Sequence, residues 1–146
     1  NPGVFRPSTG LWFLSNGPNT NNTTLPVDFD FFLGQAGDTP LAGDWNGDSI
    51  DTVGVFRGGV AQFFLSNDFL GTVDITPFVF GALGSVAFAG DWDGDGVDTI
   101  GVFNPTNGVM SLNNSNTAGN GIGDLVFTFG QNGDLPAAGD WDGKPL

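Results

Sequence analysis

The chain has 146 residues, a formal net charge of −13, and no Cys, His or Tyr. All sixteen acidic residues are Asp, and the basic residues are Arg6, Arg57 and Lys144. Because so negative a surface repels phosphate backbones and anionic lipids, we expect neither nucleic-acid binding nor binding to an acidic membrane surface. No apolar run approaches the roughly 18 residues that a membrane-spanning helix needs, so membrane insertion is not expected.

The composition predicts an all-β protein. There are 25 Gly and 9 Pro, which are typical of many short strands joined by turns. Strong helix formers are scarce, with no Glu, one Lys and one Met. Fifteen Phe and four Trp supply enough apolar surface for a core.

Turn residues divide the chain into short apolar runs, each of which is expected to form a strand. Val86–Trp92 is expected to complete the sheet that follows it rather than the one that precedes it. In chain order the expected strands are Gly3–Arg6, Leu11–Asn16, Val27–Gly34, Pro40–Trp45, Thr52–Arg57, Ala61–Asn67, Val73–Gly81, Val86–Trp92, Thr99–Asn104, Val109–Asn114, Asp124–Gly130 and Pro136–Trp141.

The sequence repeats three times. Gly3-Val4-Phe5 returns at residues 54–56 and 101–103, and Ala42-Gly43-Asp44-Trp45 returns at 89–92 and 138–141. The equivalent positions lie 47 to 51 residues apart, which divides residues 1–146 into units of about 48 residues, at about 1–51, 52–98 and 99–146. Four-stranded units of this length indicate a single repeat domain of β-propeller blades.

The strands are apolar on both faces. Along Leu11–Leu14, Trp12 and Leu14 point to one side while Leu11 and Phe13 point to the other. A sheet with one solvent-exposed face would alternate apolar and polar residues instead. We therefore expect each sheet to be covered by a neighbouring sheet on either side.

Two acidic phrases, residues 43–52 (GDWNGDSIDT) and 90–99 (GDWDGDGVDT), resemble the FG-GAP/VCBS repeats of integrin-α-like β-propellers. Phe32-Leu33-Gly34, Phe80-Gly81 and Phe129-Gly130 resemble the Phe-Gly element of that family. The resemblance implies that the Gly-Asp-Trp phrase lies on the innermost strand of a blade, and that the acidic loop after it can hold Ca²⁺. It also implies a role in adhesion, lectin-like binding or surface scaffolding.

This strand order predicts an incomplete array. The chain would begin with the outer three strands of one blade and end with an unpartnered inner strand, Pro136–Trp141. Three blades are fewer than the four to eight of a closed propeller. We expect another copy to supply the missing contacts, giving a homo-oligomer that is either a closed ring or a head-to-tail fibre. A fragment of a longer array is the other alternative.

The acidic loops are candidate calcium sites, because Asp91, Asp93 and Asp95 alternate before Gly96. The ninth position of such a loop carries Thr rather than an acid. An alternative is that these Asp residues only cap backbone N–H groups in turns. The candidate ligands are Asp91, Asp93, Asp95, Val97 and Asp98 in one loop, and Asp44, Asn46, Asp48, Ile50 and Asp51 in the other.

Several other residues suggest roles. Trp45, Trp92 and Trp141 recur at one position and are expected to pack in the core or against loops. Phe69 is the one candidate for stacking on a sugar. Arg6 and Arg57 are expected to pair with loop Asp residues. The polar segments 16–24 and 113–123 are the most variable between the units, and such loops often carry binding specificity.

Catalysis is poorly supplied, because without His, Cys, Glu or Tyr the acid–base groups reduce to Asp at repeated turn positions. We therefore predict a non-enzymatic, extracellular or cell-surface module. It would act in self-assembly or as a surface scaffold, by strand exchange between copies. The alternative is a lectin-like or adhesive propeller that binds a glycan or a protein, with Ca²⁺ as a possible cofactor.

Overall fold

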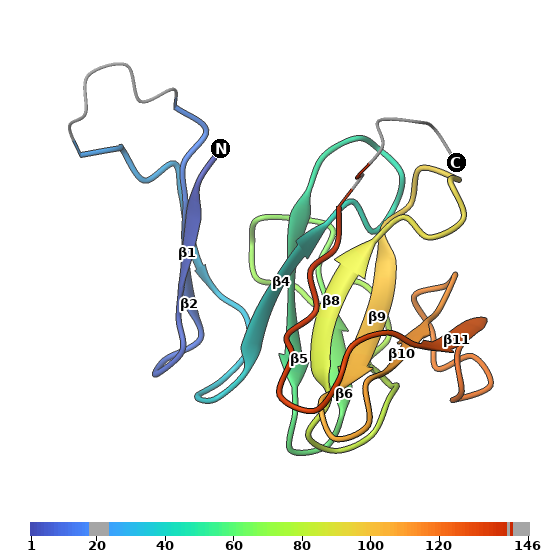
Figure 1. The fold of residues 1–146 in the computed structure, drawn as a ribbon. Helices are drawn as coiled ribbons and strands as arrows, with labels where there is room; N and C mark the ends of the chain where they lie inside the picture. Colours follow the sequence, from blue (N-terminus) through green and yellow to red (C-terminus); the bar gives the residue numbers. More distant parts are fainter. Residues whose placement is uncertain (18–23, 140, 142–146) are drawn as a thin grey trace.

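A computed structural model describes residues 1–17, 24–139 and 141. These residues form eleven strands and no helix, so the all-β prediction is confirmed for them (Figure 1). The strands are β1 (Gly3–Arg6), β2 (Leu11–Leu14), β3 (Phe29–Phe32), β4 (Thr39–Gly43), β5 (Thr52–Arg57), β6 (Gln62–Leu65), β7 (Phe78–Val79), β8 (Val86–Gly90), β9 (Thr99–Asn104), β10 (Val109–Leu112) and β11 (Leu125–Thr128).

The strands form three antiparallel sheets. The N-terminal sheet has the order β1-β2-β3, the middle sheet β4-β5-β6-β7 and the C-terminal sheet β8-β9-β10-β11. Each four-stranded sheet begins with the strand that carries the end of one sequence unit and continues with strands of the next. The expectation that residues 86–92 complete the following sheet is confirmed, because β8 pairs with β9.

The N-terminal and middle sheets pack face to face. Trp12, Phe31 and Leu33 of the first meet Val53 and Val55 of the second in one buried cluster. The indole N–H of Trp12 donates to the Leu33 carbonyl at 3.1 Å, so the polar end of the ring is satisfied inside this core.

A second core joins the middle and C-terminal sheets. It contains Phe56, Phe63 and Phe80 from one side and Ile100 and Val102 from the other. Phe63 packs between Phe56 and Phe78, with ring centroids 4.7 and 5.4 Å away. The middle sheet is therefore covered on both faces, as the two-sided apolar pattern predicts.

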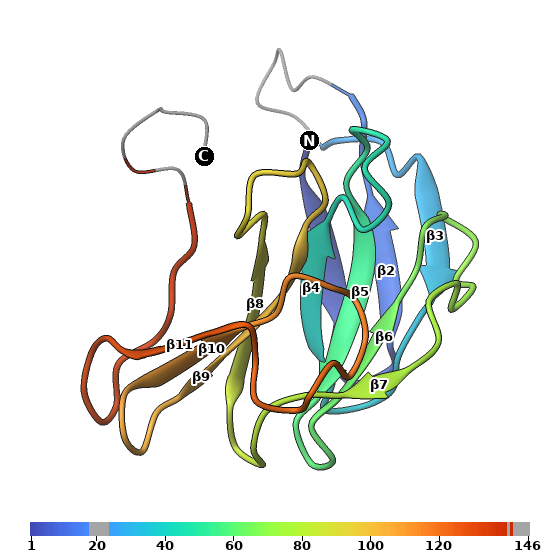
Figure 2. The same ribbon diagram turned by 90° about the vertical axis from the view of Figure 1, so that its right-hand side faces the viewer.

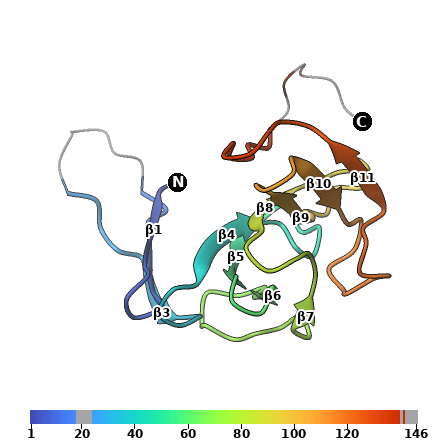
Figure 3. The same cartoon turned by 60° about the horizontal axis from the view of Figure 1, so that its bottom comes forward.

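The sheets are arranged like neighbouring blades. Figure 3 shows the inner strands β4 and β8 side by side, while β7 and β11 point away from each other. No sheet closes on itself, and the N-terminal and C-terminal sheets each leave one face without a neighbour among the described residues. The arrangement is blade-like, but it is not a closed propeller.

Some expected strands are shorter or missing. β3 and β7 cover only parts of Val27–Gly34 and Val73–Gly81, because the residues before them lie in irregular loops. The prediction of a strand at Pro136–Trp141 is wrong for the described part, since residues 136–139 belong to no sheet. In Figure 2 the chain after β11 turns back and continues to one side of β8, outside the three sheets. A strand needs a partner for its N–H and C=O groups, and here none lies alongside.

A search of the described residues for a helix of membrane-spanning length and apolarity finds none.

Candidate functional site

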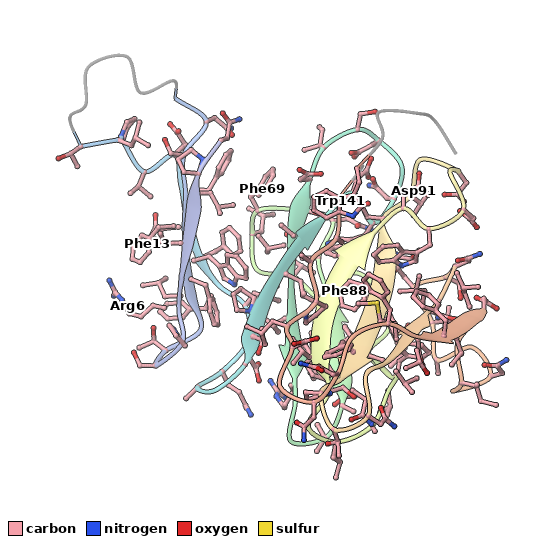
Figure 4. All side chains as sticks on the ribbon, in the orientation of Figure 1. Arg6, Phe13, Phe69, Phe88, Asp91 and Trp141 are labelled. Carbon is pink, nitrogen blue, oxygen red and sulfur yellow. The ribbon has the colours of Figure 1, made fainter. Side chains whose placement is uncertain are left out.

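Each of the two inner strands ends in an acidic loop. We call residues 44–51, after β4, the first acidic loop, and residues 91–98, after β8, the second acidic loop. Figure 4 places Asp91 in the loop at the end of β8. The third phrase of this kind, which starts at Asp140, lies almost wholly outside the described residues.

Asp44 organises the first acidic loop. One of its carboxylate oxygens accepts the backbone N–H groups of Asn46, Gly47 and Asp48 at 2.7–3.3 Å, and the other accepts that of Ser49 at 2.6 Å. Burial opposes ionisation, but these four N–H groups outweigh it and hold the pKa of Asp44 below its ordinary value. The turn forces Ser49 to a φ of 67°, a conformation that favours Gly.

Asp91 plays the same part in the second acidic loop. Its oxygens accept the N–H groups of Gly94, Asp95 and Gly96 at 2.8–3.2 Å. Burial again acts against the charge, and the backbone N–H groups again lower the pKa of Asp91. Both loops therefore have the capped-turn geometry that the sequence offered as the alternative to a metal site.

The second acidic loop also brings three carboxylates together. One oxygen each of Asp91, Asp93 and Asp95 lies within 4.8 Å of the others. Asp93 and Asp95 are exposed and Asp91 is half-buried, so solvent reaches this cluster. The three residues could hold a metal ion, since hard cations bind carboxylate oxygens.

The remaining candidate ligands lie apart from this cluster or are otherwise engaged. In the first acidic loop, Asn46 points its amide N–H at Asp48 at 3.1 Å, which uses one oxygen of that carboxylate. Ile50 and Val97 donate their backbone N–H groups to Asp48 and Asp95 at 2.9 and 2.8 Å. Asp51 is exposed.

Asp98 links the two acidic loops. Its carboxylate accepts the Asp44 N–H at 2.9 Å, and its own N–H donates to the Asp44 carbonyl at 2.7 Å. Burial is the main cause that raises its pKa. The Asp44 N–H acts in the opposite direction, and the charges of Asp51, Asp44 and Asp91 raise the pKa further. Asp98 therefore joins the middle and C-terminal sheets.

Asn116 strengthens the same junction. Its side-chain amide donates to the Asp98 carbonyl at 3.0 Å and to the Trp45 carbonyl at 3.4 Å. The loop at residues 113–123 is thus held against the adjacent sheet. The role of Asn116 could not be predicted from the sequence, because its partners lie in other repeats and nothing in the spacing reveals them.

Three aromatic predictions have different outcomes. Trp45 is 4% exposed and belongs to the core, as predicted. Trp141 is 80% exposed, so it does not pack in the core of this structure. Phe69 stacks on Phe29 with ring centroids 4.6 Å apart and packs against the core between the N-terminal and middle sheets (Figure 4). It is therefore not a free platform for a sugar.

Of the two arginines, Arg57 pairs as predicted. Its guanidinium donates to both carboxylate oxygens of Asp38 at 2.9 and 3.0 Å, and the Asp38 side chain is 1% exposed. The Asp38 carboxylate raises the pKa of Arg57 through this hydrogen bond and its charge, against the effect of burial. Arg6 is exposed and makes no ion pair within the described residues.

The N-terminal sheet has an open edge and an open face. β1 pairs only with β2 among the described residues. On the face turned away from the middle sheet, Val4 and Phe32 are 62% and 64% exposed. Figure 4 shows Arg6 and Phe13 on this outer side. An apolar pocket of about 190 Å³ lies here, lined by Pro2, Gly3, Val4, Phe13, Leu14, Ser15, Leu25, Pro26 and Val27.

The C-terminal sheet has an open face at the other end of the stack. Its strands β9, β10 and β11 put Phe103, Met110 and Phe127 in one row, in which Phe103 is buried and Phe127 is 37% exposed. Leu125 is 51% exposed and Phe129 is 70% exposed. The residues at the same repeat positions in the N-terminal sheet pack against the middle sheet. Large exposed apolar surfaces of this kind mark sites of association.

No known protein family matches the sequence, and neither curated protein sequences nor solved structures give a match. The resemblance to FG-GAP/VCBS repeats is therefore carried by the repeated residues alone.

Proposed function

We propose that this chain is a non-enzymatic repeat module that acts by self-assembly, in which strands exchanged between copies complete the blades. The proposal depends on the difference in strand number between the N-terminal sheet and the other two sheets. Among the described residues, the N-terminal sheet has no counterpart of the inner strand that β4 and β8 supply to the other two sheets. Residues 136–139 repeat the sequence of that strand but belong to no sheet.

Assembly would satisfy three exposed features at once. It would give hydrogen-bond partners to the open edge of β1, and it would cover the apolar outer faces of the N-terminal and C-terminal sheets. Unpaired edges and wide apolar faces are both unfavourable in water, so a partner that covers them gains hydrophobic stabilisation and backbone hydrogen bonds. Because the donor and acceptor surfaces differ, the contact is head-to-tail and leads to a ring or a fibre.

The alternative function, recognition of a glycan or protein by surface loops, has less support. The loop at residues 113–123 bonds to the neighbouring blade through Asn116, and Phe69 packs against the core. Part of the other variable loop, residues 18–23, lies outside the described residues. The contacts of the described loops therefore favour a structural use.

Sedimentation velocity over a wide range of protein concentrations tests the proposed assembly. We expect a concentration-dependent species larger than one chain, either a defined dimer for a closed ring or polydisperse growth for a fibre. A folded chain that sediments as a monomer at every concentration would contradict the proposal.

We further propose that the second acidic loop binds Ca²⁺ through Asp91, Asp93 and Asp95. At a Ca²⁺ concentration about ten times the Kd, binding should stabilise the fold by about 1.4 kcal/mol. Thermal unfolding with Ca²⁺ and with a chelator measures this. Asp95→Asn should remove the difference, whereas the matched change Asp48→Asn in the first acidic loop should keep it. An identical melting temperature with Ca²⁺ and with chelator would exclude the site.

The proposed setting is extracellular or cell-surface, which is supported only by a composition rich in Asp, Asn, Thr and Gly and poor in Lys.

A further inference from the structure

An ion pair marks where the inner strand joins the middle sheet. Asp38 lies in the turn before β4, and Arg57 ends β5, the strand with which β4 pairs. The two side chains make two hydrogen bonds of 2.9 and 3.0 Å. The Arg57 guanidinium also lies over the Phe64 ring, 4.4 Å from its centroid. Such two-point contacts between Arg and a carboxylate are geometrically specific.

The C-terminal sheet has uncharged residues at both of these positions. Ser85 stands before β8 where Asp38 stands before β4, and Asn104 ends β9 where Arg57 ends β5. The backbone turn is the same, because Ser85 donates its N–H to Ala82 at 3.2 Å as Asp38 does to Gln35. In both four-stranded sheets, therefore, the acid and the base are either both present or both absent.

The N-terminal sheet has the base without the acid. Arg6 ends β1 as Arg57 ends β5, and it lies over Phe13 at 4.9 Å as Arg57 lies over Phe64. The guanidinium is thus already placed as in the middle sheet. This sheet has no inner strand, so no turn brings a carboxylate to Arg6 within the described residues.

Asp134 is the matching acid without a base. Its carboxylate accepts the Gln131 N–H at 3.0 Å, as the Asp38 carboxylate accepts the Gln35 N–H at 2.9 Å. Its own N–H donates to the Gln131 carbonyl at 3.2 Å, again as in the first turn. Asp38 is 4% exposed, whereas Asp134 is exposed. The two turns are alike, and only the second lacks its arginine among the described residues.

We propose that residues 135–139 of a second copy pair with β1 as the inner strand of the N-terminal sheet, with Asp134 of that copy bound to Arg6. The inference rests on the proposed self-assembly and adds its register and its specificity. The β4–β5 pairing sets Pro40 opposite Val55 and Leu41 opposite Gly54. By repeat position, Pro136 then lies opposite Val4, and Ala137 opposite Gly3.

The same register accounts for the exposed tryptophan. In the middle sheet the Trp45 ring lies 2.9 Å from where a Cβ on Gly43 would stand and 3.5 Å from where a Cβ on Gly54 would stand. Trp141 folds over Gly139 in the same way, at 3.2 Å. Gly3 occupies the position of Gly54, so β1 leaves room for the Trp141 ring. The inner strand and its tryptophan thus match the edge of β1.

The proposed partner is a second copy, because the two halves of the contact lie on opposite sides of the middle sheet. The middle sheet separates the N-terminal sheet from the C-terminal sheet (Figures 1 and 3).

Charge reversal tests the pair. We expect Arg6→Asp and Asp134→Arg each to weaken association by roughly 30-fold or more, because each brings like charges together at a covered contact. The double variant, and an equimolar mixture of the two single variants, should both recover association. In the mixture, the carboxylate introduced at position 6 of one chain meets the guanidinium introduced at position 134 of the other. The second contact of a two-chain ring is then the original pair.

Asn132→Arg, an exposed change in the same turn as Asp134, is the matched control and should change association little. Sedimentation velocity separates the outcomes, and circular dichroism confirms that the variants fold, as exposed positions allow. Association that both single variants leave unchanged would overturn this inference while leaving self-assembly in place. Recovery in the double variant but not in the mixture would indicate pairing within one chain and would also overturn it. A wild-type chain that is always monomeric would refute the self-assembly itself.

Cross-linking tests the register separately. The chain has no Cys, so Val4→Cys and Pro136→Cys introduce the only thiols. Oxidation of a mixture of the two variants should give a disulfide-linked heterodimer, because directly opposed residues of antiparallel strands have Cα atoms near the disulfide range. Val4→Cys mixed with Gly139→Cys should give much less. Equal yields from the two mixtures would refute the register.

Discussion

Val4, Val55 and Val102 provide an internal comparison of how neighbouring sheets stabilise one another. They occupy the same repeat position, each between Gly and Phe. Val55 is 0% exposed and Val102 is 4% exposed, because a neighbouring sheet covers each of them. Val4 is 62% exposed on the open face of the N-terminal sheet. Truncating each to Ala therefore changes the same atoms in the same local structure with different burial.

The expected costs follow from that burial. Val→Ala removes two carbons, which at about 0.8 kcal/mol for each buried CH₂ amounts to about 1.6 kcal/mol of transfer free energy. A cavity adds to this at position 55, where a Cβ on Gly34 would lie 3.1 Å from a Val55 methyl group. We expect a loss of about 2–3 kcal/mol for Val55→Ala and Val102→Ala, and of less than about 0.5 kcal/mol for Val4→Ala in the isolated chain.

Urea unfolding followed by tryptophan fluorescence measures these costs, at protein concentrations low enough to keep the chain monomeric. The midpoints should shift at constant slope. At higher concentrations, Val4→Ala should weaken association, because assembly covers this face. If Val4→Ala costs the monomer as much as Val55→Ala does, or if Val55→Ala costs less than about 0.5 kcal/mol, the stacking of sheets is not what buries these residues.

Two further predictions concern carboxylates that bind within the fold. Asp38→Asn should lower the free energy of unfolding in urea by about 2–4 kcal/mol, because it leaves Arg57 without its charged partner. The exposed control Asp30→Asn should change this free energy little. Equal losses for the two variants would argue against the ion pair. The pKa of Asp44 is lowered in the folded state, so its contribution to stability is present above the unfolded pKa and is lost as pH falls through the folded one. Asp44→Asn should therefore lower the free energy of unfolding at neutral pH, since the variant loses the Ser49 N–H bond to the second oxygen. The difference in free energy from the unsubstituted protein should become smaller in acid. A difference that does not change with pH would refute this role of Asp44.

The local elements could be predicted well because their signals are local. The turn that precedes β2 needs a left-handed residue, and Gly10 with a φ of 74° supplies it. The acidic turns also followed from spacing, since an Asp that caps the next few N–H groups has its partners within five residues. The strand ends were less predictable, because apolar residues such as Val73 continue a strand pattern where no partner strand lies alongside.

The candidate site was only partly predictable. The convergence of Asp91, Asp93 and Asp95 followed from their alternation. The role of Asp98 did not, because the N–H that it accepts belongs to a residue 54 positions earlier in the chain. The carboxylate partner of Arg57 was expected among the loop Asp residues, but its identity as Asp38 depends on how β4 pairs with β5.

The sequence by itself determined the strands, the turns and the threefold repeat, because backbone preferences and the alternation of side chains act over a few residues. Only the tertiary structure decided which copy of each motif is buried. Trp45 and Trp141 share one motif, as do Val4 and Val55, and yet one of each pair is covered and the other is exposed. The local preferences of the two copies are the same, but a side chain is excluded from water only where a neighbouring sheet covers it. Whether a sheet covers it depends on how the sheets pack and not on the motif.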